Sequence, residues 1–301
     1  MADRPMAGCP TIGLIGAGRA AGVIGVALAE AGYDVVAVGS RTAASAEAVS
    51  ALVGGAGAVG CRAVAVQEVA DAAELVLVTT NDGAIGSVAS ELRWRAGQAV
   101  VHCSGALSTE PLAPAGEAGA LIGSWHPFQT LTGQATLKGA TFGIEADEPL
   151  FGMLSDMTIA VGGSPLSVPA EARVLYHAAS VLSCGYLTTL LREAGRLWEQ
   201  AGLPADAAMP AIAAIAEATL ANVRALGPGA TMTGPTSRGD LGTVRLHLDS
   251  VAKAAPELLP LYTAISSRSV ALAHEAGRPT NTVDEWDALF AEYSNARQSD
   301  R

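Results

Sequence analysis

The sequence predicts an α/β fold for the first half of the chain and an all-α fold for the second half. Up to Val168, short apolar runs alternate with helical patterns, which is typical of βαβ units around a parallel sheet. A glycine-rich turn joins the first apolar run to the first helical pattern, and beyond Val168 only helical patterns remain. We therefore expect a Rossmann parallel sheet in residues 1–168 and an all-α domain for substrate binding and dimerisation in residues 169–301.

The composition indicates a compact protein with a small-molecule substrate. Of the 301 residues, 50% are hydrophobic and 16% are charged, which is enough apolar surface for two cores. The formal net charge of −11 argues against nucleic acid or an anionic membrane as a partner, because both require basic patches.

The cysteine spacing and the hydropathy favour a cytoplasmic protein. Cys9, Cys61, Cys103 and Cys184 form no CxxC pair and no His stands at metal-ligand spacing, so we expect reduced thiols and no metal site. The first ten residues lack the apolar core of a signal peptide. No later stretch offers the roughly 18 uninterrupted apolar residues of a membrane span.

The apolar runs of the first half predict the strands in order. Runs such as 75–78 are apolar throughout, as is typical of strands that are covered on both faces. The expected strands are 12–15, 35–38, 62–66, 75–79, 99–102, 120–124, 141–145 and 165–168. Helices are expected at 17–31 and 150–160.

Glycine and proline divide the second half into helices. A long helix over 171–201 ends before Gly202 and Pro204, and a helix over 205–226 ends before Gly227. A loop rich in Gly and Pro follows over 231–240. Further helices are expected at 241–254, 257–275 and 282–293.

The turn after the first strand predicts a dinucleotide site. In Gly16-x-Gly18-x-x-Ala21, Gly16 permits the tight turn, Gly18 lets the backbone approach a pyrophosphate, and Ala21 allows close contact between helix and strand. The helix N-terminus offers unpaired N–H groups to the phosphates. Other residues expected along the cofactor are Arg19, Ala20, Thr79, Thr80 and Asn81. The alternative is an ordinary glycine-rich βα turn.

The end of the second strand predicts NADP(H) rather than NAD(H). A site that prefers NAD places Asp or Glu there to bind the ribose hydroxyls, whereas this chain has Ser40, Arg41 and Thr42. The Arg41 guanidinium suits a 2′-phosphate, and the hydroxyls on either side can hydrogen-bond to it. The alternative is that Arg41 is a solvated residue at a helix start.

Two histidines follow neighbouring strands of the predicted sheet. His102 precedes Cys103 and Ser104, and we expect Ser104 to lie near the nicotinamide. His102 itself stands at a buried strand end, where backbone groups are an alternative partner. His126 is expected in a loop after the sixth strand, and an imidazole with a pKa near 6.5 suits it to proton transfer near neutral pH.

Candidate groups of the second half lie on the long helix and in the Gly-Pro loop. His177 begins a polar strip on the helix that faces either a cleft or solvent. In the loop, Arg238 suits a substrate carboxylate, Thr236 supplies a hydroxyl, and Asp240 either takes part in catalysis or caps the next helix. For His247 we favour a structural role.

Four ordered motifs resemble one family. They are His102-Cys103-Ser104-Gly105-Ala106-Leu107, Trp125-His126-Pro127-Phe128-Gln129-Thr130, Tyr176-His177-Ala178-Ala179, and Gly234-Pro235-Thr236-Ser237-Arg238-Gly239-Asp240, which is followed by Thr243-Val244 and His247-Leu248. The chain resembles Rossmann-like proteins that carry the domain of unknown function 2520 at their C-terminus. These are similar to ketopantoate reductases, 6-phosphogluconate dehydrogenases and pyrroline-carboxylate reductases. The resemblance implies a helical domain that commonly dimerises.

One departure from this family bears on the chemistry. The family usually reads Ser-Asn-Tyr where this chain has Cys184-Gly185-Tyr186. His177 stands roughly where related reductases carry a Lys, which moves the expected chemistry to His126, His177 and Asp240. We expect an NADPH-dependent reductase of a small carbonyl substrate such as a 2-keto acid. The alternatives are an imine reductase and a non-catalytic NADP-binding sensor.

Overall fold

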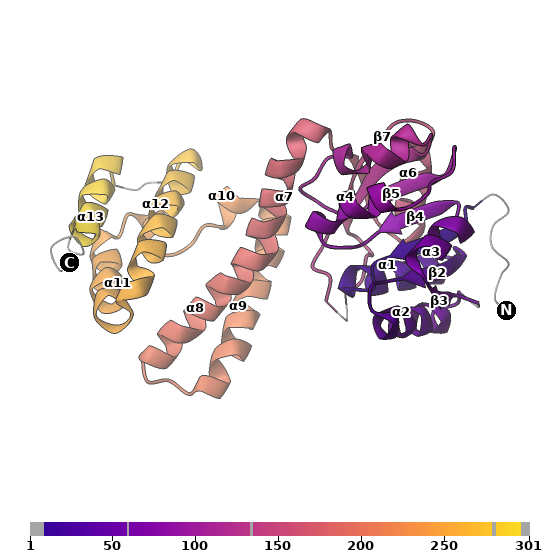
Figure 1. Cartoon of the computed structure of the whole chain (residues 1–301). Coiled ribbons are helices and arrows are strands. Elements are labelled where there is room, and N and C mark those ends of the chain that lie inside the picture. Colours follow the sequence, from indigo (N-terminus) through magenta and orange to yellow (C-terminus); the bar gives the residue numbers. More distant parts are fainter. Residues whose placement is uncertain (1–8, 59, 133–134, 279–280, 296–301) are drawn as a thin grey trace. The chain divides into compact units, whose positions relative to one another are not determined.

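A computed structural model describes residues 9–58, 60–132, 135–278 and 281–295. The chain divides into two compact units, residues 1–184 and 185–301, which are described in turn (Figure 1). The sequence assigned the stretch 169–184 to the helical domain, and in the structure this stretch is part of the first unit.

The first unit is built on one eight-stranded sheet with the order β3-β2-β1-β4-β5-β6-β7-β8. The strands are β1 (Ile12–Ile15), β2 (Val35–Gly39), β3 (Arg62–Val64), β4 (Leu75–Val78), β5 (Ala99–His102), β6 (Leu121–Phe128), β7 (Thr141–Ala146) and β8 (Ser164–Ser167). β6 and β7 are antiparallel, and the other paired neighbours are parallel. The predicted Rossmann sheet is confirmed, and at one edge β7 and β8 run antiparallel to the other strands.

The strand order reverses at β1, which lies between β2 and β4. Ile15 pairs with Gly39 on one side and with Val78 on the other. The turns after these three strands therefore leave the sheet together. Open α/β sheets bind their ligands at such a position, outside the carboxyl ends of the strands.

Helices cover the sheet of the first unit. They are α1 (Arg19–Glu30), α2 (Ala43–Gly55), α3 (Val66–Ala72), α4 (Asp82–Glu91), α5 (Ala113–Glu117) and α6 (Leu150–Ala160), with short 3-10 turns η1 (Glu110–Leu112) and η2 (Ala170–Ala172). Successive strand residues enter different apolar clusters: Leu14 packs in one and Ile15 in the other. Because side chains alternate along a strand, both faces of the sheet are buried, as the unbroken apolar runs predicted.

One continuous helical segment follows the sheet. It consists of α7 (Arg173–Val181), a π-helical turn η3 (Leu182–Tyr186) and α8 (Leu187–Gln200), where the sequence predicted a single helix. Residues 170–200 are long and apolar enough to cross a membrane, with a mean hydropathy of 1.4 in the best 18-residue window. The expectation that no such stretch exists is wrong for this helix, because Ser, Thr and Gly interrupt its apolar residues without lowering the mean hydropathy below that of a membrane span. A helix that packs against another protein surface has the same composition.

The second unit is helical, as predicted. Besides α8 it contains α9 (Ala205–Leu226), α10 (Pro228–Thr231), α11 (Leu241–Ala254), α12 (Leu259–Glu275) and α13 (Val283–Asn295), with 3-10 turns η4 (Thr236–Arg238) and η5 (Pro256–Leu258). α8 packs against α9, and α12 packs against α13. Val244, Leu248, Trp286 and Phe290 belong to its apolar core.

Candidate active site

The glycine turn after β1 has the geometry that the sequence predicted. Gly16 has a φ of +106°, and a Cβ there would lie 2.9 Å from the backbone of Thr79 and Thr80, so only glycine fits. The Thr79 hydroxyl donates to the carbonyl oxygens of Ile15 and Gly16, at 3.1 and 3.2 Å. Thr79, a predicted cofactor residue, therefore holds the turn through its side chain.

The N-terminus of α1 is open for an anion. Gly18 is the N-cap residue and makes no side-chain cap, and a Cβ built on it would meet nothing within 4 Å. The first N–H groups of a helix have no partner inside the helix, so those of Arg19, Ala20 and Ala21 point to this space. Together with the helix dipole they form a site for a phosphate.

A cavity of about 600 Å³ extends over this turn. Its lining includes Gly16, Gly18, Ser40, Arg41, Thr80 and Asn81. The Thr80 hydroxyl oxygen is buried and has no hydrogen-bond partner among the described residues. A cavity of this size, with an uncapped helix N-terminus and an unsatisfied hydroxyl, fits a dinucleotide.

The end of β2 supplies a cation and hydroxyls to the same cavity. Arg41 is exposed at its edge, and the Ser40 hydroxyl accepts a 3.4 Å hydrogen bond from the N–H of Thr42, the N-cap residue of α2. Ser45 also lines the cavity. Ser45 was not among the predicted cofactor residues, although its place four residues after Arg41, in the first turn of α2, indicated it. The first acidic residue after the strand is Glu47.

A second group of side chains meets beside the loop that follows β5. The rings of His126 and His177 lie edge to face, with centroids 5.9 Å apart. A Cβ on Gly105 would lie 2.7 Å from both Nε2 of His126 and Cδ2 of His177. The structure therefore brings two predicted catalytic histidines together, and it does so because position 105 has no side chain.

His126 lies on a strand, where the sequence predicted a loop. β6 continues to Phe128 because it pairs with the antiparallel β7, and His126 stands opposite Gly143. Pro127 had indicated a loop, since proline lacks the N–H that a strand ladder uses. The strand fixes the direction of the imidazole more firmly than a loop would.

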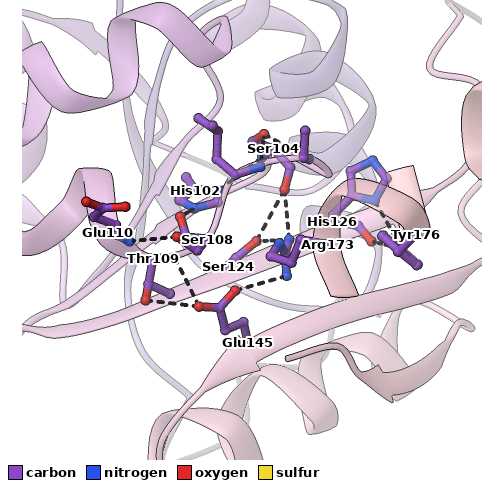
Figure 2. A network of polar contacts seen from close by, with 12 residues as sticks. His102, Ser104, Ser108, Thr109, Glu110, Ser124, His126, Glu145, Arg173 and Tyr176 are labelled. Atoms are coloured by element: carbon purple, nitrogen blue, oxygen red, sulfur yellow. Dashed lines mark hydrogen bonds and ion pairs between the residues drawn. The ribbon is translucent and has the colours of Figure 1, made fainter. Parts of the chain in front are cut away.

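Tyr176 also belongs to this group, although the sequence indicated it only as part of the motif Tyr176-His177-Ala178-Ala179. Its hydroxyl oxygen lies 3.0 Å from Nδ1 of His126 (Figure 2). Burial raises the pKa of Tyr176, so the hydroxyl keeps its proton. The pair is formed by residues 50 positions apart, which no local pattern shows; the only indication was that Tyr176 precedes His177.

Burial also determines the charge of His126. It lowers the pKa of the ring to about 3, with smaller contributions from His177, Arg173 and His102. This corrects the expectation of a pKa near 6.5, because at neutral pH the ring is uncharged. His126 therefore acts as a neutral hydrogen-bonding group rather than as an imidazolium acid.

Ser104 and His102 form hydrogen bonds that hold the loop after β5. The Ser104 hydroxyl accepts hydrogen bonds from the N–H groups of Ala106 and Leu107, at 3.3 and 3.1 Å. His102 is fully buried, and its Nε2 lies 2.8 Å from the carbonyl oxygen of Ser108. Its Nδ1 accepts from the N–H of Ser104 at 3.2 Å. These contacts favour the alternative in which His102 pairs with backbone groups.

The remaining predicted residues lie in the second unit. Thr236 and Arg238 belong to the turn η4, and Arg238 is exposed. Asp240 caps α11: its Oδ1 accepts from the N–H of Thr243 at 3.0 Å, and its Oδ2 from the Thr243 hydroxyl at 2.7 Å. His247 pairs with the Tyr262 hydroxyl at 2.7 Å. Among the described residues no cluster of three or more potential metal ligands occurs.

The fold and the cavity define a class of protein: a Rossmann domain with an open glycine turn, followed by a helical domain. Comparison with protein families identifies the two domains. A Rossmann-like domain matches residues 7–127, and the domain of unknown function DUF2520 matches residues 140–269. The chain thus contains a Rossmann-like domain followed by a DUF2520 domain. No curated protein matches the sequence.

Several solved structures share this architecture. A proposed NADP oxidoreductase from Bacteroides fragilis is 26% identical, with a TM-score of 0.69 over 87% of this chain and 98% of that one. A 1-pyrroline-5-carboxylate reductase from Streptococcus pyogenes is 13% identical, with a TM-score of 0.62 over 88% and 98%. A reductive aminase from Aspergillus terreus, solved with NADPH and ethyl-5-oxohexanoate, is 18% identical, with a TM-score of 0.63 over 94% and 99%. At 13% and 18% identity, the similarity to the pyrroline-5-carboxylate reductase and to the reductive aminase shows a shared fold.

Proposed function

We propose that the protein is an NADPH-dependent oxidoreductase that reduces a small carbonyl compound such as a 2-keto acid. The observation that carries the proposal is the cavity over the uncapped N-terminus of α1, with Arg41 and Ser40 at the end of β2 and no carboxylate before Glu47. The similar protein from Bacteroides fragilis, described as an NADP oxidoreductase, supports it.

In this proposal the cofactor residues divide by position. The glycine turn and the first N–H groups of α1 bind the pyrophosphate, and Arg19 adds positive charge beside it. Arg41, with Ser40, binds the 2′-phosphate. Thr80 and Asn81, after β4, face the nicotinamide. The loop after β5 is adjacent, since the N–H of Cys103 donates to the carbonyl oxygen of Val78 at 3.2 Å.

The reaction requires a hydride, which bound NADPH supplies, and a proton for the alkoxide. Tyr176 and His126 form a neutral pair suited to hold that proton. When the Tyr176 hydroxyl donates to Nδ1, the ring proton of His126 lies on Nε2, which a Cβ built on Gly105 would approach to 2.7 Å. A neutral imidazole N–H there polarises a carbonyl by hydrogen bonding.

The neutral state of His126 is also compatible with a second candidate, reduction of an imine. A protonated C=N group carries its own proton, so it needs no acid from the protein and is reduced by hydride alone. The lowered pKa of His126 fits this reaction as well as it fits carbonyl polarisation. Screening 2-keto acids and cyclic imines across pH separates the two, because only imine turnover rises as the substrate is protonated.

Calorimetric titration with NADPH and NADH tests the cofactor assignment. We expect NADPH to bind at least tenfold more tightly than NADH, and Arg41→Ala to weaken NADPH binding about 10- to 100-fold while leaving NADH unchanged, since a charge-assisted hydrogen bond contributes about 1.5–3 kcal/mol. Arg62→Ala is the matched control, because Arg62 is also exposed but begins β3 outside the cavity. Equal binding of the two nucleotides would refute the assignment.

A further inference from the structure

A buried polar network links the loop of residues 104–109 to the helix that carries Tyr176 and His177 (Figure 2). Arg173 is at its centre. We infer that Arg173 is a positioning residue of the candidate active site. Its side chain holds the loop of residues 104–109 in the place where Gly105 packs against the rings of His126 and His177. The inference rests on the proposed function for its catalytic consequence, whereas its contacts are independent of any substrate.

Arg173 connects four segments of the first unit. It is the first residue of α7, and its side chain is fully buried. Nη2 donates to the carbonyl oxygen of Ser104 at 2.9 Å and to the hydroxyl of Ser124 on β6. Nη1 lies 3.6 Å from Oε2 of Glu145 on β7. One guanidinium therefore ties the helix to the loop after β5 and to two strands.

Glu145 holds the other end of the same loop. Its Oε1 accepts from both the N–H and the hydroxyl of Thr109, at 3.1 Å each. Arg173 binds the loop at residue 104 and Glu145 binds it at residue 109, so the ion pair fixes both ends. Between them, Ser108 is held through its carbonyl oxygen by His102.

The position of this loop leaves little freedom at the site. Gly105 is already so close to His126 and His177 that a single added carbon would lie 2.7 Å from each. Movement of the loop toward the rings would displace them, and movement away would admit water between them. A misplacement of about 1 Å lowers turnover by about 100-fold in many enzymes.

The ion pair of Arg173 and Glu145 is poorly suited to a role in stability alone. Among the described residues, Nε and Nη1 of Arg173 and Oε2 of Glu145 have no hydrogen-bond partner, although all three atoms are buried. Buried ion pairs with such defects are often no more stable than apolar side chains of the same volume. What an apolar replacement cannot reproduce is the direction of the bonds to Ser104 and Thr109.

The experiment replaces both charges at once, in Arg173→Met/Glu145→Gln, so that no unpaired charge remains buried. Arg95→Met is the matched control: its guanidinium also binds backbone carbonyls, those of Ala70, Asp71 and Ala73, but at the opposite ends of the strands. The readouts are the NADPH Kd, the ¹³C shifts of the His126 and His177 rings, and kcat and KM for a reducible substrate. Gly105→Ala, which displaces the rings directly, supplies the reference shifts.

We expect the double variant to bind NADPH within about twofold of the wild type, to shift both ring signals in the direction of Gly105→Ala, and to lower kcat by about 10- to 100-fold with little change in KM. Arg95→Met should leave the ring signals in place. If the double variant does not fold, Ser124→Ala removes one acceptor of Arg173 and should cause a smaller shift of the same kind. Unchanged ring signals overturn the inference. Absence of turnover in the wild type instead refutes the proposed function, and the ring signals still decide on Arg173.

Discussion

The burial of a single imidazole has a consequence for stability as well as for chemistry. Burial, with smaller contributions from the nearby His177, Arg173 and His102, lowers the pKa of His126 to about 3 in the folded chain. In the unfolded chain a histidine binds a proton below about pH 6.5. Between these two values the unfolded state holds the extra proton, so acid favours unfolding.

The predicted pH dependence follows from that difference. As the pH falls from about 6.5 toward 3, we expect His126 to reduce the free energy of unfolding by at most about 1.4 kcal/mol per pH unit, with no contribution above that range. His126→Gln should be less sensitive to acid than the wild type, as measured by urea unfolding at a series of pH values. His274→Gln, at an exposed histidine, should follow the wild-type curve. Parallel curves for the wild type and His126→Gln would contradict the prediction.

At the scale of a helix, Asp240 has two candidate roles, as the cap of α11 and as a catalytic carboxylate. Both of its carboxylate oxygens bind Thr243, which satisfies the start of α11 and lowers the pKa of the carboxyl group. Asparagine also caps helices, whereas alanine does not. We therefore expect Asp240→Ala to lower the midpoint of thermal unfolding by about 2–4 °C, and Asp240→Asn to retain most of it.

The same two variants test the catalytic role that the sequence left open for Asp240. If capping is its role, activity at a temperature well below the midpoint stays near the wild-type level in Asp240→Asn. A variant that is folded and stable but has lost turnover would show instead that the carboxylate acts in the reaction. Circular dichroism and a steady-state assay of the same preparations provide both readouts.

Strands, helices and the cofactor turn were predictable from the sequence because their determinants are local. Unbroken apolar runs gave the buried strands, and the glycines gave the turn before α1. The extension of β6 was not predictable, because it depends on pairing with β7. Tyr176, Glu145 and Arg173 likewise gain their roles from partners 36 to 69 positions away. The site's histidines were found as residues, but the network that positions them was not.

At the scale of the whole molecule, α9 of the second unit and α7 of the first unit each expose large apolar side chains. On α9, Ile215, Leu220 and Leu226 are 69%, 54% and 64% exposed, and on α7 Leu175 is 78% exposed. Large exposed apolar groups of this kind mark interaction surfaces. We propose that they are covered in a homodimer, which also accounts for the apolar composition of residues 170–200 without a membrane.

Sedimentation at micromolar concentration tests this proposal. We expect a species of twice the chain mass of 30.2 kDa. We expect the double variant Ile215→Asp/Leu226→Asp to weaken association by about 100-fold or more. Truncation of a central interface residue costs about 1–2 kcal/mol of binding free energy, and burial of a charge costs more. Leu52→Asp, at a comparably exposed leucine on α2, is the control and should leave the mass unchanged. A wild-type monomer that instead binds lipid vesicles would refute the dimer and assign the apolar helix to a membrane surface. A dimer that persists in the α9 double variant would place the interface on another surface of the chain.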